Sequence, residues 1–160
     1  MQKITTCLWF DGNAEEAVNF YVSLFKNSKV LDISRYGEAG PGPEGSVLTM
    51  RFQLEGVELM ALNGGPAFTF TEAISLSVDC QLQAEVDDLW EKLTADGGEP
   101  SQCGWLKDRF GLSWQIVPRA LIEMLGDPDP GKSKRVMEAM LKMQKIEIAE
   151  LEKAYEGVPA

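Results

Sequence analysis

The sequence predicts an α+β fold made of two βαβββ modules and a helical extension. Segments that favour strands and helices occur in the same order twice along the 160 residues. The pair Phe20-Tyr21 in the first expected helix has a counterpart, Leu89-Trp90, at the like position of the second. The expected ranges are a single domain over residues 1–160, modules at 1–63 and 73–118, and the helical extension at 119–160.

The first module is expected to start with a strand and a helix, because the turn sequence Asp11-Gly12-Asn13 separates two apolar segments. Asn13 has the side chain of an N-cap, and apolar residues at three- and four-residue steps give the helix one face that packs on a sheet. Gly and Pro then concentrate in a loop at residues 37–45. The expected elements are a strand at Ile4–Phe10, a helix at Ala14–Phe25, and strands at Val30–Tyr36, Ser46–Leu54 and Val57–Asn63.

The second module repeats this order and ends in a β-hairpin. Aromatic and branched residues on both sides of Gly111 favour strands, Gly111 favours the turn, and Pro118 ends the second strand. The expected elements are a strand at Ala73–Val78, a helix at Gln83–Ala95, a short strand at Ser101–Cys103, and hairpin strands at Trp105–Phe110 and Leu112–Val117. The side chains expected between sheet and helix are Trp9, Phe20, Tyr21, Leu76, Leu89, Trp114 and Ile116. The same order of elements is also compatible with a ferredoxin-like α+β dimer.

Three stretches resemble a known family: WFDGNAEEAVNFY, CGWLKDRFGLSWQIVP and MLKMQKIEIAELEKAY. In the second, the spacing of Asp108, Gly111 and Gln115 resembles the last hairpin of the vicinal oxygen chelate superfamily, which includes glyoxalase I, extradiol dioxygenases and the fosfomycin and bleomycin resistance proteins. The chain is most similar to the PhnB-like branch, called 3-demethylubiquinone-9 3-methyltransferase-like. The resemblance implies a glyoxalase-like cup between two curved sheets, in which a small molecule binds.

The sequence contains no histidine, which removes the commonest metal ligand and the usual general base. In metal-dependent members of the superfamily, His or Glu ligands come from the first and last strands of each module. The resemblance places Thr6, either Leu59 or Met60, Ala73 or a neighbour, and Gln115 at those positions. None of them offers an imidazole or a carboxylate, so no metal and no cofactor are expected.

Alternation of side chains along the expected strands assigns one face of each sheet to the cup. Cys7 and Trp9 are expected on the opposite, helix-covered face. Within the cup, Arg51 is expected to hold a carboxylate or phosphate, or to pair with an acid such as Glu58. The expected cup lining consists of Thr6, Leu8, Arg51, Ser75, Ser77, Trp105, Ser113 and Gln115. Lys107 and Asp108, next to the hairpin turn, are expected at a solvated rim.

Composition limits the partners of the chain. Twenty-five acidic against 15 basic residues give a formal charge of −10, which disfavours nucleic acid and anionic membrane surfaces as partners. The three cysteines have no CxxC spacing, and no export signal or long apolar segment is evident. A cytoplasmic protein with reduced thiols is expected.

These observations favour a metal-independent domain that binds a small molecule, whether or not it is an enzyme. The first alternative is a methyltransferase, as the family label implies. Its weakness is that the only glycine cluster, GEAGPGPEG, is interrupted by prolines and does not lead from a strand into a helix. The second alternative is a structural dimerisation module.

The extension is expected to form one long helix at Ser133–Tyr155, which lacks Gly and Pro. Met137, Leu141, Ile148 and Leu151 fall near one side of that helix. Their apolar face requires cover, either from the chain's own sheet or from a second subunit. We expect a homodimer in which the second subunit supplies at least part of this cover.

Overall fold

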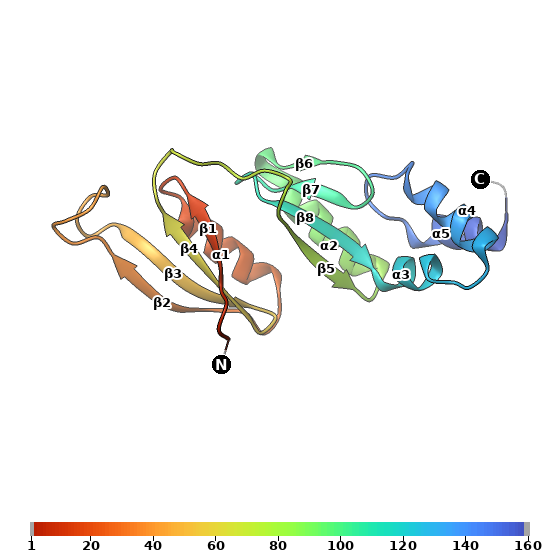
Figure 1. Cartoon of the computed structure of the whole chain (residues 1–160), viewed down its shortest axis with the longest axis horizontal. Helices are drawn as coiled ribbons and strands as arrows, with labels where there is room; N and C mark the ends of the chain where they lie inside the picture. Colours follow the sequence, from red (N-terminus) through yellow and green to blue (C-terminus); the bar gives the residue numbers. More distant parts are fainter. Residues whose placement is uncertain (1, 159–160) are drawn as a thin grey trace. The chain divides into compact units, whose positions relative to one another are not determined.

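The computed structural model describes residues 2–158 and contains both predicted modules (Figure 1). In the first module, the sheet has the strand order β1-β4-β3-β2; β1 and β4 are parallel and the other pairs are antiparallel. Its elements are β1 Thr6–Phe10, α1 Ala14–Leu24, β2 Lys29–Arg35, β3 Val47–Leu54 and β4 Val57–Asn63.

The second module has the same topology, with strand order β5-β8-β7-β6 and a parallel β5–β8 pair. Its elements are β5 Ser75–Cys80, α2 Gln83–Thr94, a 3₁₀ turn η1 at Ala95–Gly97, β6 Glu99–Pro100, β7 Trp105–Lys107 and β8 Ser113–Pro118. The predicted α+β class with two βαβββ modules is therefore confirmed. Each sheet stays open rather than closing into a barrel.

The chain divides into two compact units, one that ends at Phe70 and one that begins at Thr71. In each unit a single helix, α1 or α2, packs on one face of the sheet (Figure 1). The opposite side is called the open face below. Each unit thereby buries an apolar core between its own helix and its own sheet, as the amphipathic helices require.

The core of the first unit contains Tyr21 of α1 and Phe52 of β3, and that of the second contains Leu89 of α2 and Trp114 of β8. Tyr21, Leu89, Trp114 and Ile116 are buried as predicted, whereas Phe20 and Leu76 are only partly buried. The prediction for Trp9 is wrong. Its neighbour Leu8 lies on the α1 side of the sheet, so Trp9 points to the open face.

The start of α1 is capped by a residue far away in the sequence. Asn13 occupies the N-cap position, but its side chain makes no capping hydrogen bond. Instead, the backbone N–H of Ala14 donates to Oδ1 of Asn63 at 3.0 Å, and Nδ2 of Asn63 donates to the carbonyl of Val47 at 3.1 Å. One amide at the end of β4 thus ties the helix to the sheet.

Asp108 holds the hairpin turn from inside, so its predicted position at a solvated rim is wrong. Its side chain is 2% exposed. Oδ1 accepts from the backbone N–H groups of Phe110 and Leu112 at 2.8 and 3.1 Å, and Oδ2 accepts from Trp114 Nε1 at 2.9 Å. Gly111 supplies the turn with φ +89°. Three donors around one carboxylate explain why an ionisable group lies in the core.

The predicted single helix at Ser133–Tyr155 is wrong, because the extension contains shorter helices. They are α3 Arg119–Leu125, α4 Pro130–Met140 and α5 Ile148–Glu156. The oxygen Oδ1 of Asp129 caps α4 by accepting from the N–H groups of Gly131 and Lys132, and Pro130 fits the first helical turn. The helix consequently begins before Ser133. Of the predicted ranges, residues 1, 159 and 160 lie outside the described residues.

Contacts with the loop before β7 and with α2 interrupt the extension between α4 and α5. The carbonyls of Met143 and Gln144 accept from the N–H groups of Cys103 and Gly104 at 2.9 and 2.8 Å. The side chain of Gln83 in α2 donates to the Ile146 carbonyl at 2.9 Å and accepts from the Ile148 N–H at 2.7 Å. These tertiary hydrogen bonds outweigh the helix propensity of the segment, so the chain is not helical between Met140 and Ile148.

The apolar side of the extension is covered in part within its own unit. Buried side chains from all three helices and from the turn between α4 and α5 form one cluster, which consists of Leu121, Val136, Ile146 and Leu151. Of the four residues predicted to align on one side, Leu151 is buried, Ile148 is half-buried, and Met137 and Leu141 are exposed. None of the helices among residues 2–158 has both the length and the apolar character that a bilayer crossing requires.

Candidate functional site

The strand register decides which predicted site residues of the first sheet lie on its open face. Met50, Ala61 and Leu8 are cross-strand neighbours and are all buried against α1. Leu8 therefore does not line the cup, contrary to the prediction. Thr6 is two residues away in the same strand, so its side chain lies on the same side of the sheet as Leu8. The open face instead presents Cys7 beside Met60.

The alternative between Leu59 and Met60 is settled by the same register. Leu59 pairs with Phe52 and is 5% exposed, so it belongs to the core. Met60 pairs with Arg51 and lies on the open face. In the first strand the open face carries Cys7 rather than Thr6, because a shift of one residue along a strand reverses the face.

Arg51 lies on the open face of the first sheet but is held by two carboxylates. Its Nη2 and Nε are 2.6 and 2.7 Å from Asp32 Oδ2, and its Nη1 is 2.6 Å from Glu58 Oε1. Hydrogen bonds to Asp32, and then to Glu58, raise the pKa of Arg51. Of the two roles expected for Arg51, pairing with an acid describes its position, and a ligand anion would have to compete with both partners.

The open face of the second sheet brings together five of the predicted residues. Ser75 lies beside Ser113 across the parallel β5–β8 pair, and Ser77 lies beside Gln115 in the same register. Trp105 of β7 is the antiparallel neighbour of Gln115. Within this row, Gln115 Nε2 donates to Ser75 Oγ at 3.0 Å. Sequence alternation therefore gave the correct face for β5 and β8.

A pocket of about 360 Å³ is lined by two residues of this row, Trp105 and Ser113, and it is called the sheet pocket below. Its wall includes Ser113, which is 1% exposed and whose Oγ has no hydrogen-bond partner among the described residues. Lys107 at the same pocket is in contact with the carboxylate of Glu72. The lining residues are Glu72, Glu99, Pro100, Ser101, Trp105, Leu106, Lys107 and Ser113.

Lys107 and Glu72 shift each other's pKa in the sheet pocket, and both shifts favour the charged forms. The hydrogen bond from Lys107 lowers the pKa of Glu72, and the same hydrogen bond raises the pKa of Lys107. Both therefore stay charged at neutral pH. Sequence reasoning missed Glu72 because it precedes β5 in a connecting segment. For Lys107, the feature that indicates a place in the site is its position in β7, directly opposite Ser113 of β8.

The residues on the open faces do not fit the transition-metal site of the superfamily. On the open faces, the positions that correspond to the expected metal ligands are occupied by Cys7, Met60, Ser75 or Ser77, and Gln115. None of these positions carries an imidazole or a carboxylate, and Cys7 is the one position with a thiol. Residues 2–158 contain no group of three or more His, Cys, Asp or Glu side chains that could hold a metal ion.

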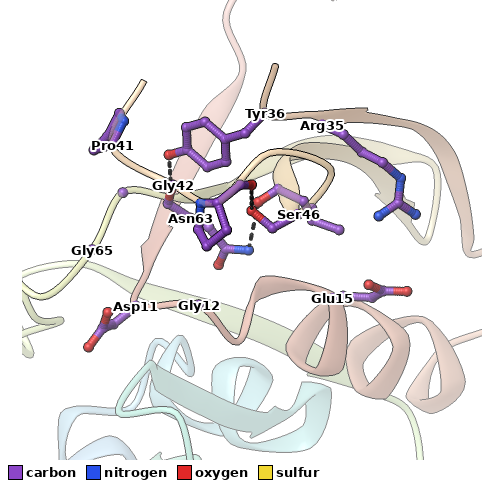
Figure 2. Close-up of a pocket in the computed structure, with 13 residues that line it drawn as sticks. Asp11, Gly12, Glu15, Arg35, Tyr36, Pro41, Gly42, Ser46, Asn63 and Gly65 are labelled. Atoms are coloured by element: carbon purple, nitrogen blue, oxygen red, sulfur yellow. Dashed lines mark hydrogen bonds between the residues drawn. The ribbon is translucent and has the colours of Figure 1, made fainter. Parts of the chain in front are cut away.

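The first unit contains a larger pocket, of about 580 Å³, between the start of α1 and the loop that joins β2 to β3 (Figure 2). It is called the loop pocket below. None of the predicted site residues lines it. The lining residues are Asp11, Gly12, Glu15, Arg35, Tyr36, Pro41, Gly42, Pro43, Ser46, Val47, Asn63, Gly64 and Gly65. The loop pocket has no signature in the sequence beyond the Gly- and Pro-rich loop.

Comparison with known proteins gives the relatives of the chain. Residues 2–117 match the family model described as 3-demethylubiquinone-9 3-methyltransferase. The PhnB protein from Bacillus cereus is 44% identical, with a TM-score of 0.68, over 73% of this chain and 99% of that chain. A protein from Pseudomonas aeruginosa shares the fold at 22% identity and a TM-score of 0.60, over 74% of this chain and 98% of that chain.

More distant structures also match. A glyoxylase/bleomycin resistance protein/dioxygenase domain from Frankia is 16% identical with a TM-score of 0.46, over 71% of this chain and 94% of that chain. No curated protein sequence matches. The family match ends at residue 117, so α3, α4 and α5 lie outside it. The chain belongs to the PhnB-like, 3-demethylubiquinone-9 3-methyltransferase family.

Proposed function

We propose that the chain binds a small polar molecule on the open face of the second sheet, in the sheet pocket, without a bound metal. The observation that carries this proposal is the hydroxyl of Ser113. It is buried and has no partner among the described residues, although it lies at the wall of a pocket. A buried polar group without a partner costs about 1–3 kcal/mol, and a ligand that hydrogen-bonds to it would remove this cost.

Neighbouring groups indicate the chemistry of the ligand. Gln115 is the cross-strand neighbour of Trp105 and does not itself line the pocket. Its amide N–H binds Ser75, which leaves the amide oxygen available as an acceptor next to the pocket. The Trp105 ring offers an apolar surface at the same pocket. The pocket also holds the carboxylates of Glu72 and Glu99 and the ammonium group of Lys107. Charged and neutral groups beside an aromatic ring suit a small polar molecule that carries both hydrogen-bond donors and acceptors. Because the chain has no histidine, we assign binding roles here and no proton transfer.

We also propose that the protein acts in the cytoplasm and as a homodimer. Reduced thiols suit the cytoplasm: Cys7, Cys80 and Cys103 are all free, and burial raises the pKa of Cys80 to about 12. The dimer proposal rests on apolar side chains that stay exposed on the extension, which are Ile122, Met137 and Leu141. Light scattering tests it: the proposal requires a mass twice 17.7 kDa.

The methyltransferase alternative has less support. The glycine cluster at residues 37–45 joins the antiparallel strands β2 and β3, whereas a nucleotide-binding turn joins a strand to a helix. A thermal-shift measurement with a methyl-donor cofactor, beside pools of small polar molecules, separates the two proposals.

The substitution Ser113→Ala tests the proposed site. It removes the unpartnered hydroxyl, so we expect the free protein to keep its stability or to gain up to about 1 kcal/mol in urea unfolding. The same change should abolish the thermal shift produced by molecules that stabilise the wild-type protein. Opposite effects on stability and on binding are the signature of a functional hydroxyl.

Ser77→Ala is the matched control, because Ser77 of β5 is an exposed serine on the same open face as Ser113 but outside the sheet pocket. This variant should lose little stability and should retain most of the ligand-induced shift. A Ser113→Ala protein that binds the same molecules as tightly as wild type would refute the site. Elemental analysis that finds a stoichiometric transition metal in protein purified without chelator would refute metal independence.

A further inference from the structure

The loop pocket carries charges of both signs that have no charged partner. Arg35, at the end of β2, uses Nη1 to donate to the Gly45 carbonyl at 3.2 Å, and no carboxylate among the described residues pairs with it. The carboxylates of Asp11 and Glu15 have no ion-pair or hydrogen-bond partner within residues 2–158. All three residues are exposed, and all three line the same cavity, where a ligand can reach them.

The wall of the loop pocket is fixed by buried contacts. The Tyr36 hydroxyl donates to the Asn63 carbonyl at 2.6 Å, and the Asn63 side chain joins α1 to β3. The Tyr36 N–H donates to the Ser46 carbonyl at 2.9 Å, which closes the base of the loop. A Cβ atom on Gly42 would lie 2.3 Å from the Tyr36 ring, so the loop backbone rests directly on this ring. A pocket with fixed walls binds a ligand at a lower entropic cost.

The charges are separated along the loop pocket. In Figure 2, Arg35 and Glu15 lie towards one end and Asp11 lies towards the other. The cavity of about 580 Å³ has the size of a site for a molecule larger than a single amino acid. A ligand that reaches from Asp11 to Arg35 can neutralise both without bringing its own charges together.

We propose that the loop pocket binds a short zwitterion of dipeptide size. Its ammonium group pairs with Asp11, its carboxylate receives a charge-assisted hydrogen bond from Arg35, and Glu15 accepts from an amide N–H. This site lies in the first unit and is independent of the sheet pocket. The two proposals stand or fall separately, because they involve different units of the chain.

A set of related probes tests the charge requirement on the unmodified protein. The probe is the dipeptide L-alanyl-L-alanine, compared with its N-acetyl derivative, which lacks the ammonium group, and its C-terminal amide, which lacks the carboxylate. Titrations followed by amide chemical shifts should show changes at Asp11, Gly12, Tyr36 and Ser46. Each blocked derivative should bind roughly tenfold more weakly, as expected for the loss of one charge-assisted hydrogen bond. Absence of binding by the dipeptide, or equal binding by all three probes, would overturn the proposal.

Charge-removing variants locate the two ends of the ligand. Arg35→Gln should weaken binding of the free dipeptide and leave binding of its C-terminal amide unchanged. Asp11→Asn should weaken binding of the free dipeptide and leave binding of the N-acetyl derivative unchanged. Lys29→Gln is the control, because Lys29 lies at the opposite end of the same strand and outside the pocket. Spectra of the free variants show whether they fold. A Lys29→Gln protein as impaired as Arg35→Gln would attribute the effect to net charge and contradict the site.

Discussion

Asp108 shows how one side chain shapes the residues that follow it. Its two carboxylate oxygens accept from two backbone N–H groups of the turn and from the indole of Trp114. The turn therefore has a fixed geometry, and β8 leaves it with Trp114 directed to the core and Ser113 to the open face. Through these contacts a buried acid sets the register of the strand that carries the candidate site.

Replacement of Asp108 tests this role. Asp108→Ala leaves three donors without an acceptor in a buried place, so we expect a loss of about 3 kcal/mol or more in the free energy of unfolding. Asp108→Asn keeps the shape and one oxygen, and it should cost less. Urea denaturation of both variants measures the difference. Equal stability of Asp108→Ala and wild type would show that the turn does not depend on the carboxylate.

Residue patterns predicted the candidate site only in part. For β5 and β8, alternating serines and apolar residues identified the correct face, because the apolar set includes the large side chains of Trp114 and Ile116. For β1, both faces carry apolar residues, so alternation does not distinguish them, and Leu8 lies in the core rather than in the cup. Glu72 and the loop pocket depend on contacts between distant segments, which spacing cannot reveal.

At the scale of elements, the extension behaves as a part of the second unit. Gln83 in α2 binds the turn before α5 with both ends of its amide, and Lys145 in that turn pairs with Asp87 of α2 at 2.8 Å. In addition, Arg135 of α4 donates to the carbonyls of Ala154 and Tyr155, both at 2.8 Å. The absence of Gly and Pro predicted helix correctly at both ends, but the local sequence contains no sign of these distant partners.

Gln83→Ala should release this turn. The change leaves the Ile148 N–H and the Ile146 carbonyl without their partner, at a cost of about 1–3 kcal/mol. Hydrogen exchange should accelerate at residues 146–156 and stay unchanged in the sheet of the first unit. Gln144→Ala, which alters an exposed side chain of the same turn, is the control. Uniform acceleration in both units would contradict a local attachment.

The pairing of Lys145 with Asp87 also predicts a pH dependence. The hydrogen bond from Lys145, followed by that from Gln83, lowers the pKa of Asp87 below its ordinary value of 3.8. An acid with a lowered folded-state pKa stabilises the fold above its unfolded-state pKa, and that contribution is lost as pH falls through the folded-state value. Asp87→Asn should therefore be less stable than wild type at neutral pH, and the difference should shrink below about pH 4. Urea midpoints across this range measure it, and a difference independent of pH would contradict the pairing.

At the scale of the whole molecule, the order of elements predicted the architecture well. Two repeats of β-α-β-β-β leave few topologies, and both sheets have the predicted connections. The duplicated plan supplies two open faces of different chemistry. The first sheet presents a guanidinium held between two carboxylates, and the second presents a row of neutral hydrogen-bonding groups beside a pocket. This contrast is the reason for placing the ligand on the second sheet.

The most direct test is to map a bound molecule residue by residue. The ligand with the largest thermal shift should be titrated into isotope-labelled protein, and amide chemical shifts should be recorded. The account predicts saturable changes at Ser101, Trp105, Lys107 and Ser113, which line the sheet pocket, with residues 83–94 of α2 unaffected. Changes that spare these four residues while the ligand binds elsewhere would contradict it.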